Sequence, residues 1–108
     1  MIVTTTSTVE GRPIAEYKGI VSGTAIHGIN VGKDLKAFGR NLVGGRAGAY
    51  EDEIGKAQNE AMAEMQKAAE ELSANAIVGV SLDFEGVGSN GSMLLVSVTG
   101  TAVVVAPG

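Results

Sequence analysis

The longest regular pattern of apolar and polar positions in this 108-residue chain runs from Glu51 to Leu72. Apolar residues recur there at spacings of three and four, which places them on one face of a helix. Charged residues repeat these spacings one position earlier, so they occupy the solvated side. The pattern predicts a long amphipathic helix whose alanines allow close packing. Its apolar stripe consists of Ile54, Ala57, Ala61, Met65, Ala68 and Leu72.

Two strands and a short helix are predicted before the long helix. Ile2 to Thr6 is a β-branched run, and Ile14 to Ile26 alternates between polar and apolar positions. A short amphipathic pattern follows and ends at Gly44, which is typical of a helix terminus. The apolar positions of this short helix are Val31, Leu35, Phe38 and Leu42.

Two long strands are predicted after the long helix, joined through a turn at Gly86 to Ser92. Gly100 interrupts the last strand and predicts a bend or bulge. Strands of this length expose their edges unless something covers them, and a partner subunit is the simplest cover. The predicted core positions are Val78, Val80, Leu82 and Phe84 on the first strand and Leu94, Val96, Val98, Ala102 and Val104 on the second.

Length and composition indicate one domain over residues 1–108, and the predicted elements make it an α+β fold with a small antiparallel or mixed sheet and the order β-β-α-α-β-β. The net charge is −4 and no Lys or Arg follows Lys67, which argues against a general nucleic-acid surface. No apolar run is long enough to span a bilayer, and no secretory leader is recognisable. We therefore expect a cytoplasmic protein with neither a membrane nor a nucleic acid as partner.

The glycines from Gly86 to Gly91 match the G-x-G-x-x-G spacing of dinucleotide-binding turns. That chemistry needs a helix at the third glycine, whereas a valine-rich strand follows here. We interpret this segment as a hairpin loop.

A second glycine loop begins with Gly44-Gly45-Arg46 and extends to Tyr50, directly before the predicted long helix. Free backbone amides, an arginine and a helix N-terminus together favour an anion. The loop lacks the Gly-Lys-Ser or Gly-Lys-Thr of a phosphate-binding loop, and acids follow it directly. Gly44, Gly45, Arg46 and Tyr50 are therefore candidate ligand-binding residues, with an ordinary loop in which Arg46 pairs with a carboxylate as the alternative.

His27 is the only histidine, and it lies at the end of a predicted strand. Asp83 and Glu85, two apart on one strand face, are the carboxylates that would complete a divalent metal site with it. An ordinary strand-end histidine explains the residue equally simply. In a ring of subunits, however, one ligand per subunit becomes several around an axis.

Catalysis has little support in the chain. There is no cysteine, no G-x-S-x-G elbow and no histidine other than His27 to act as a base. We expect a protein that is not an enzyme.

Five segments resemble the YbjQ-like family of small bacterial proteins, which carries the label "putative heavy-metal-binding". The resemblance covers nearly the whole chain, and it implies a ring-like homo-oligomer, expected to be a pentamer, with no established function. Ser73 stands where relatives commonly have a helix-ending glycine, and the lack of cysteine disfavours soft metals. The segments are TTSTVEG near the start, GIVSG from Gly19, GGRAGAYEDEI from Gly44, ANAIVGVSLDFE from Ala74 and NGSMLLVSVTGTAVVV from Asn90.

Three functions remain open at this level. The first is a homo-oligomer that binds a divalent metal ion or a small anion at subunit interfaces. The second is a structural or protein-interaction scaffold without a small ligand. The third, an enzyme that uses His27 or the pair Asp83 and Glu85, has the least support.

Overall fold

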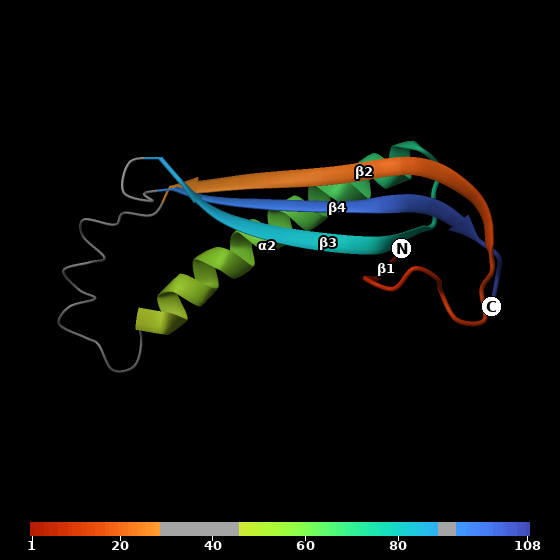
Figure 1. Cartoon of the computed structure of the whole chain (residues 1–108), viewed down its shortest axis with the longest axis horizontal. Coiled ribbons are helices and arrows are strands. Elements are labelled where there is room, and N and C mark those ends of the chain that lie inside the picture. The colour runs from red at the N-terminus through yellow and green to blue at the C-terminus, as the bar shows by residue number, and fades with distance from the viewer. Residues whose placement is uncertain (29–45, 89–92) are drawn as a thin grey trace.

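The computed structural model describes residues 1–28, 46–88 and 93–108 as an α+β fold with one helix on a mixed four-stranded sheet. The strands are β1 (Ile2–Val3), β2 (Ile14–Gly28), β3 (Ala76–Val87) and β4 (Met93–Val105), and the helix is α2 (Arg46–Glu71). The strand order is β1-β3-β4-β2, in which β4 pairs antiparallel with both long neighbours and β1 pairs parallel with β3. The helix runs along one face of this sheet (Figure 1). The predicted short helix falls outside the described residues.

The alanine stripe of α2 packs directly on β2. Ala57, Ala61 and Met65 have no exposed surface, and a Cβ atom on Gly23 of β2 would overlap the carbonyl group of Ala61. Glycine at position 23 is therefore what lets helix and strand approach so closely. The predicted helix start at Glu51 was five residues late, and Leu72 lies beyond the helix end, where it is 40% exposed. Ala69 occupies the buried position there instead.

Ser73 caps the C-terminus of the helix, two residues after Glu71, and adopts a left-handed backbone conformation with φ of 62°. The amide of Ala74 donates to the carbonyl of Ala69 at 3.0 Å, and that of Ser73 to Glu70 at 2.9 Å. This is the hydrogen-bond pattern of a Schellman cap, formed here without glycine. Ser73 is thus the capping residue of the helix. The side chain of Asn75 bonds to both backbone groups of Val105, at 2.7 and 3.0 Å.

A bulge in β3 changes the face of one predicted core residue, Val78, while Val80 and Leu82 lie on the helix-facing side as predicted. The pairing with β4 shifts register between Val78 and Ser81, where Gly79 has φ of 61°. The extra residue moves Val78 to the sheet face away from the helix, whereas Val80 stays in the cluster beneath α2. The bulge predicted at Gly100 therefore lies in β3, the strand that pairs with β4 at this point. Gly100 leaves room for Ile77, because a Cβ atom added at Gly100 would lie 2.6 Å from a methyl group of Ile77.

The N-terminal segment covers the other face of the sheet at one end. Ile2, Val9 and Ile14 pack there against a small buried cluster of Ala76, Val78, Val103 and Val105. The first strand is shorter than predicted, but Thr4 and Thr6 continue to bond to the backbone of β3 as far as Val80.

The hairpin predicted between the last two strands is confirmed, because Val87 of β3 pairs with Met93 of β4. The first described element after this loop is the strand β4, whereas a dinucleotide-binding turn leads into a helix. In the part of the chain described by the structure, no helix is both long and apolar enough to cross a bilayer.

Candidate functional site

The one histidine of the chain lies between two glutamates of the helix. Nε2 of His27 is 2.8 Å from Oε2 of Glu60, and Nδ1 is 3.4 Å from Oε2 of Glu53. The imidazole is 17% exposed, while the side chains of Glu53 and Glu60 are 39% and 62% exposed. We call His27, Glu53 and Glu60 the His27 cluster. It lies near the end of β2, where α2 packs against that strand.

Helix and strand geometry together explain the cluster. His27 has the same strand parity as Val21, Gly23 and Ala25, whose positions face the helix. Glu53 and Glu60 are seven residues apart, which is about two helical turns, so both side chains leave the same flank of α2. The strand therefore presents its imidazole between them.

The two carboxylates change the protonation of the ring. The hydrogen bond with Glu60 contributes most to raising the pKa of His27 above its ordinary value of 6.5. Partial removal from water acts in the opposite direction, and the hydrogen bond with Glu53 raises the pKa further. When both nitrogens carry protons, the imidazolium donates to a carboxylate on each side.

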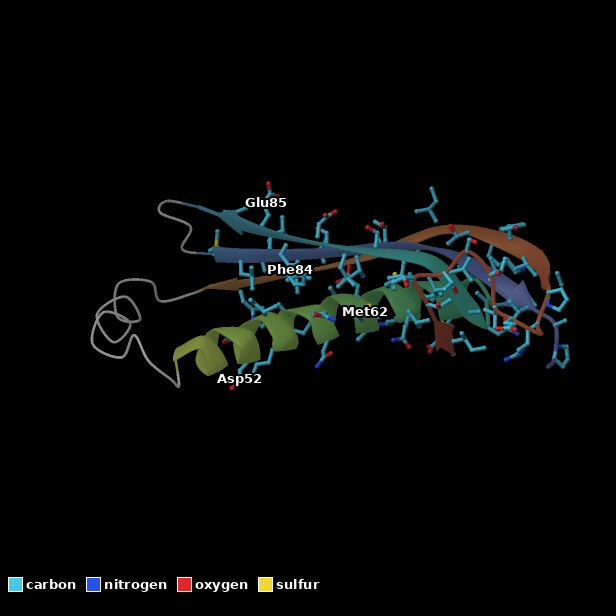
Figure 2. All side chains as sticks on the ribbon, turned by 60° about the horizontal axis from the view of Figure 1, so that its bottom comes forward. Asp52, Met62, Phe84 and Glu85 are labelled. Carbon is cyan, nitrogen blue, oxygen red and sulfur yellow. The ribbon has the colours of Figure 1, made fainter. Side chains whose placement is uncertain are left out.

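The acids predicted to join His27 lie elsewhere. Asp83 pairs with Ser97 and Glu85 with Leu95, positions on the sheet face away from α2 and two strands from His27. Figure 2 shows Glu85 directed away from the helix and Phe84 on the helix side of β3. Within one subunit, the structure does not bring His27 together with Asp83 and Glu85.

The anion site predicted before the helix is only partly described. Gly44 and Gly45 fall outside the described residues. Arg46 and Tyr50 lie in the first two turns of α2. Because the helix begins at Arg46, the acids from Glu51 onward lie beyond its first turn. This removes one objection to an anion at the helix start, and the anion site stays a prediction.

The donor groups of the His27 cluster suit some metals better than others. Among residues 1–28, 46–88 and 93–108, no three side chains of His, Cys, Asp or Glu are grouped to hold one ion. One subunit offers an imidazole nitrogen and the Glu60 carboxylate, a pair that suits zinc-like cations. Thiophilic metals fit poorly at the His27 cluster, since the chain has no cysteine and the cluster holds no sulfur ligand.

Sequence reasoning found His27 but assigned Glu53 and Glu60 to a solvated helix face. The signal that could have found them was the parity of His27, which places it on the strand face that packs against the helix. Two acids at a seven-residue spacing on the adjacent helix flank were then the natural partners.

Comparison with known proteins gives a consistent family and fold. Residues 1–106 match the YbjQ family model, described as "Putative heavy-metal-binding". A protein of Listeria grayi named UPF0145 protein is 54% identical over 105 residues, which is 97% of this chain and 99% of that protein. A solved structure from Pediococcus pentosaceus, of unknown function and from the DUF74 family, aligns with a TM-score of 0.70 at 22% identity over 97% of both chains, which supports the fold.

Proposed function

The chain belongs to the YbjQ family, and we propose that it works as a homo-oligomer that binds a zinc-like divalent cation at His27, where subunits meet. The observation that carries this proposal is the imidazole of His27 lying between two carboxylates. Two acceptor groups facing both ring nitrogens favour positive charge between them. A proton, favoured by the raised pKa of His27, can supply that charge, and a metal ion can supply it instead.

In this proposal the two nitrogens of the His27 imidazole have different roles. Glu53 accepts a hydrogen bond from Nδ1–H, which fixes the orientation of the imidazole and leaves the Nε2 lone pair for the ion. Carboxylates in this position behind a ligating histidine commonly strengthen metal binding. Glu60, whose oxygen lies 2.8 Å from Nε2, supplies the second ligand.

Two ligands leave the coordination sphere of a zinc-like ion incomplete, because such ions usually take four. The missing ligands come from water or from a second copy of the chain. A second copy is favoured by the position of His27 on β2, which is an edge strand of 15 residues with β4 as its one partner strand among the described elements. A closed ring, for which the family resemblance implies five copies, would place several such clusters around one axis.

Isothermal titration of the metal-free protein with Zn²⁺, Ni²⁺ and Cd²⁺ tests this function. We expect Zn²⁺ and Ni²⁺ to bind with release of a proton, and His27→Gln and Glu60→Gln to abolish binding. Glu53→Gln should weaken it by roughly tenfold or more, as loss of an outer-shell carboxylate usually does. Glu64→Gln, an exposed acid of the same helix, is the matched control and should bind normally. Binding that survives His27→Gln would refute the assignment.

The second candidate is a scaffold that takes no small ligand. It is favoured by the same cluster, since an imidazolium alone satisfies both carboxylates and ties β2 to α2. An oligomer that shows no heat with any cation would decide for the scaffold.

A further inference from the structure

We propose that Lys56 of α2 is an internal competitor of the cation at the His27 cluster. Its ammonium group neutralises the Glu60 carboxylate in the metal-free protein and turns toward Asp52 when a cation binds. This inference rests on the cation site of the proposed function and names the residue that regulates how readily that site is occupied.

The spacing of α2 places Lys56 beside both carboxylates of the cluster. Lys56 follows Glu53 by three residues and precedes Glu60 by four. Residues at these spacings are neighbours on the surface of a helix. Both carboxylates pair with His27 in the structure, and the exposed lysine stays outside these pairs. Its ammonium group is therefore next to the site and free to move.

Asp52 offers the same lysine a second partner away from the site. It precedes Lys56 by four residues, and an acid in that position relative to a lysine is the favourable orientation for a helix ion pair. Asp52 is exposed, and Figure 2 shows it on the side of α2 that faces away from the sheet. The lysine can thus leave Glu60 without losing a carboxylate partner.

Like charges make the lysine and the cation competitors for Glu60. A divalent cation and an ammonium group at about 6 Å, the spacing of such neighbours, repel each other in water by enough to weaken binding roughly tenfold. If Lys56 turns toward Asp52, the separation grows and the loss becomes smaller. Lys56 therefore lowers the affinity of the site for any divalent cation, and Asp52 limits that loss.

The helix carries a second copy of this charge pattern that serves as an internal control. Glu64, Lys67 and Glu71 repeat the spacing of Glu53, Lys56 and Glu60 eleven residues later, about 16 Å along the axis. All three residues of the second copy are exposed. His27 is the only histidine of the chain and pairs with the first copy, so only Lys56 adjoins the proposed cation.

Titration of the metal-free protein with Zn²⁺ at low ionic strength tests the competition. We expect Lys56→Gln to bind Zn²⁺ about threefold to tenfold more tightly than the wild type, and Ni²⁺ by the same factor, because the repulsion depends on charge. The gain should nearly vanish at about 1 M salt, where the Debye length is about 3 Å. Lys67→Gln is the matched control and should bind like the wild type. Lys56→Arg keeps the charge and should also bind like the wild type.

A double-mutant cycle tests the part given to Asp52. Asp52→Asn should weaken Zn²⁺ binding by about twofold to threefold in the wild type, because the lysine then stays at Glu60. In the Lys56→Gln background the same substitution should weaken binding by a clearly smaller factor. Equal weakening in both backgrounds would mean that Asp52 and Lys56 act independently, which would overturn the inference.

The remaining outcomes separate this inference from the proposed function. Wild-type protein and Lys56→Gln that both fail to bind Zn²⁺ would refute the cation site itself. A wild type that binds, with Lys56→Gln no tighter or Lys56→Arg as tight as Lys56→Gln, would overturn the competition alone. Lys56 is exposed, so its variants should stay folded, and thermal melts of each variant verify this.

Discussion

His27 and Glu60, separated by 33 residues in the sequence, meet at 2.8 Å between the ring nitrogen Nε2 and the carboxylate oxygen Oε2. The contact joins the end of the edge strand β2 to the middle of α2. It lies toward the end of a seam in which Gly23 and Ala61 bring the same two elements together by backbone contact. The seam is apolar at Gly23 and ionic at His27, so its strength should depend on pH at one end only.

The pH dependence of stability should report this ionic contact. The pKa of His27 is raised in the folded state, so its stabilising contribution is complete below the unfolded value of 6.5 and is lost as the pH rises through the higher folded value. We expect the melting temperature of the wild type to exceed that of His27→Gln most at about pH 5 to 6, where the glutamates are still ionised. The difference should shrink above neutral pH.

Glu64→Gln provides the control for this melting experiment, because Glu64 is an exposed acid that shares the helix but not the cluster. Its melting temperature should follow the wild type across the same pH range. A wild-type advantage over His27→Gln that grew with pH would contradict the role given to the imidazolium.

Substitution of Gly23 should test the apolar part of the seam. In Gly23→Ala, the new methyl group would overlap the Ala61 carbonyl and approach the Met65 amide at 2.9 Å, so the helix must move away from β2. Overpacking of this kind costs about 1–3 kcal/mol of unfolding free energy. Chemical denaturation measures it.

Gly55→Ala is the matched control for the same methyl addition. Gly55 lies inside α2, and a Cβ there meets no atom within 4 Å. Alanine should therefore stabilise the protein by up to about 1 kcal/mol, from helix propensity alone. If both substitutions had the same sign, close packing at Gly23 would not be the determinant we describe.

The helix cap offers a stabilising substitution. Ser73 holds a left-handed conformation at φ of 62°, which glycine adopts at no steric cost. We expect Ser73→Gly to stabilise the fold by about 0.5–1 kcal/mol, and Ser73→Ala to give no gain. A destabilised Ser73→Gly variant in a thermal melt would show that the serine side chain contributes something that the cap geometry does not explain.

Periodicity predicted most of the fold because each element carries a local pattern. The alanine stripe, the antiparallel hairpin and the long strands all follow from spacings of three and four or of two. The face of Val78 could not be predicted, because the bulge at Gly79 changes parity there and depends on how β3 pairs with β4.

The candidate site was only half predictable for a related reason. His27 stands out as a unique residue, but its partners Glu53 and Glu60 look like any solvated acids until the helix is placed over β2. The carboxylates predicted from the sequence, Asp83 and Glu85, lie on the other face of the sheet, because strand pairing decides which residues meet.

The imidazole of His27 gives the most direct measurement, since it is the only one in the chain and its ring nitrogens can be followed by ¹⁵N NMR without assignment. We predict that one equivalent of Zn²⁺ per subunit shifts the Nε2 resonance while Nδ1 keeps its proton, and that Glu60→Gln abolishes the shift. Ring resonances that respond to pH but stay unchanged at saturating Zn²⁺ would contradict cation binding at this site.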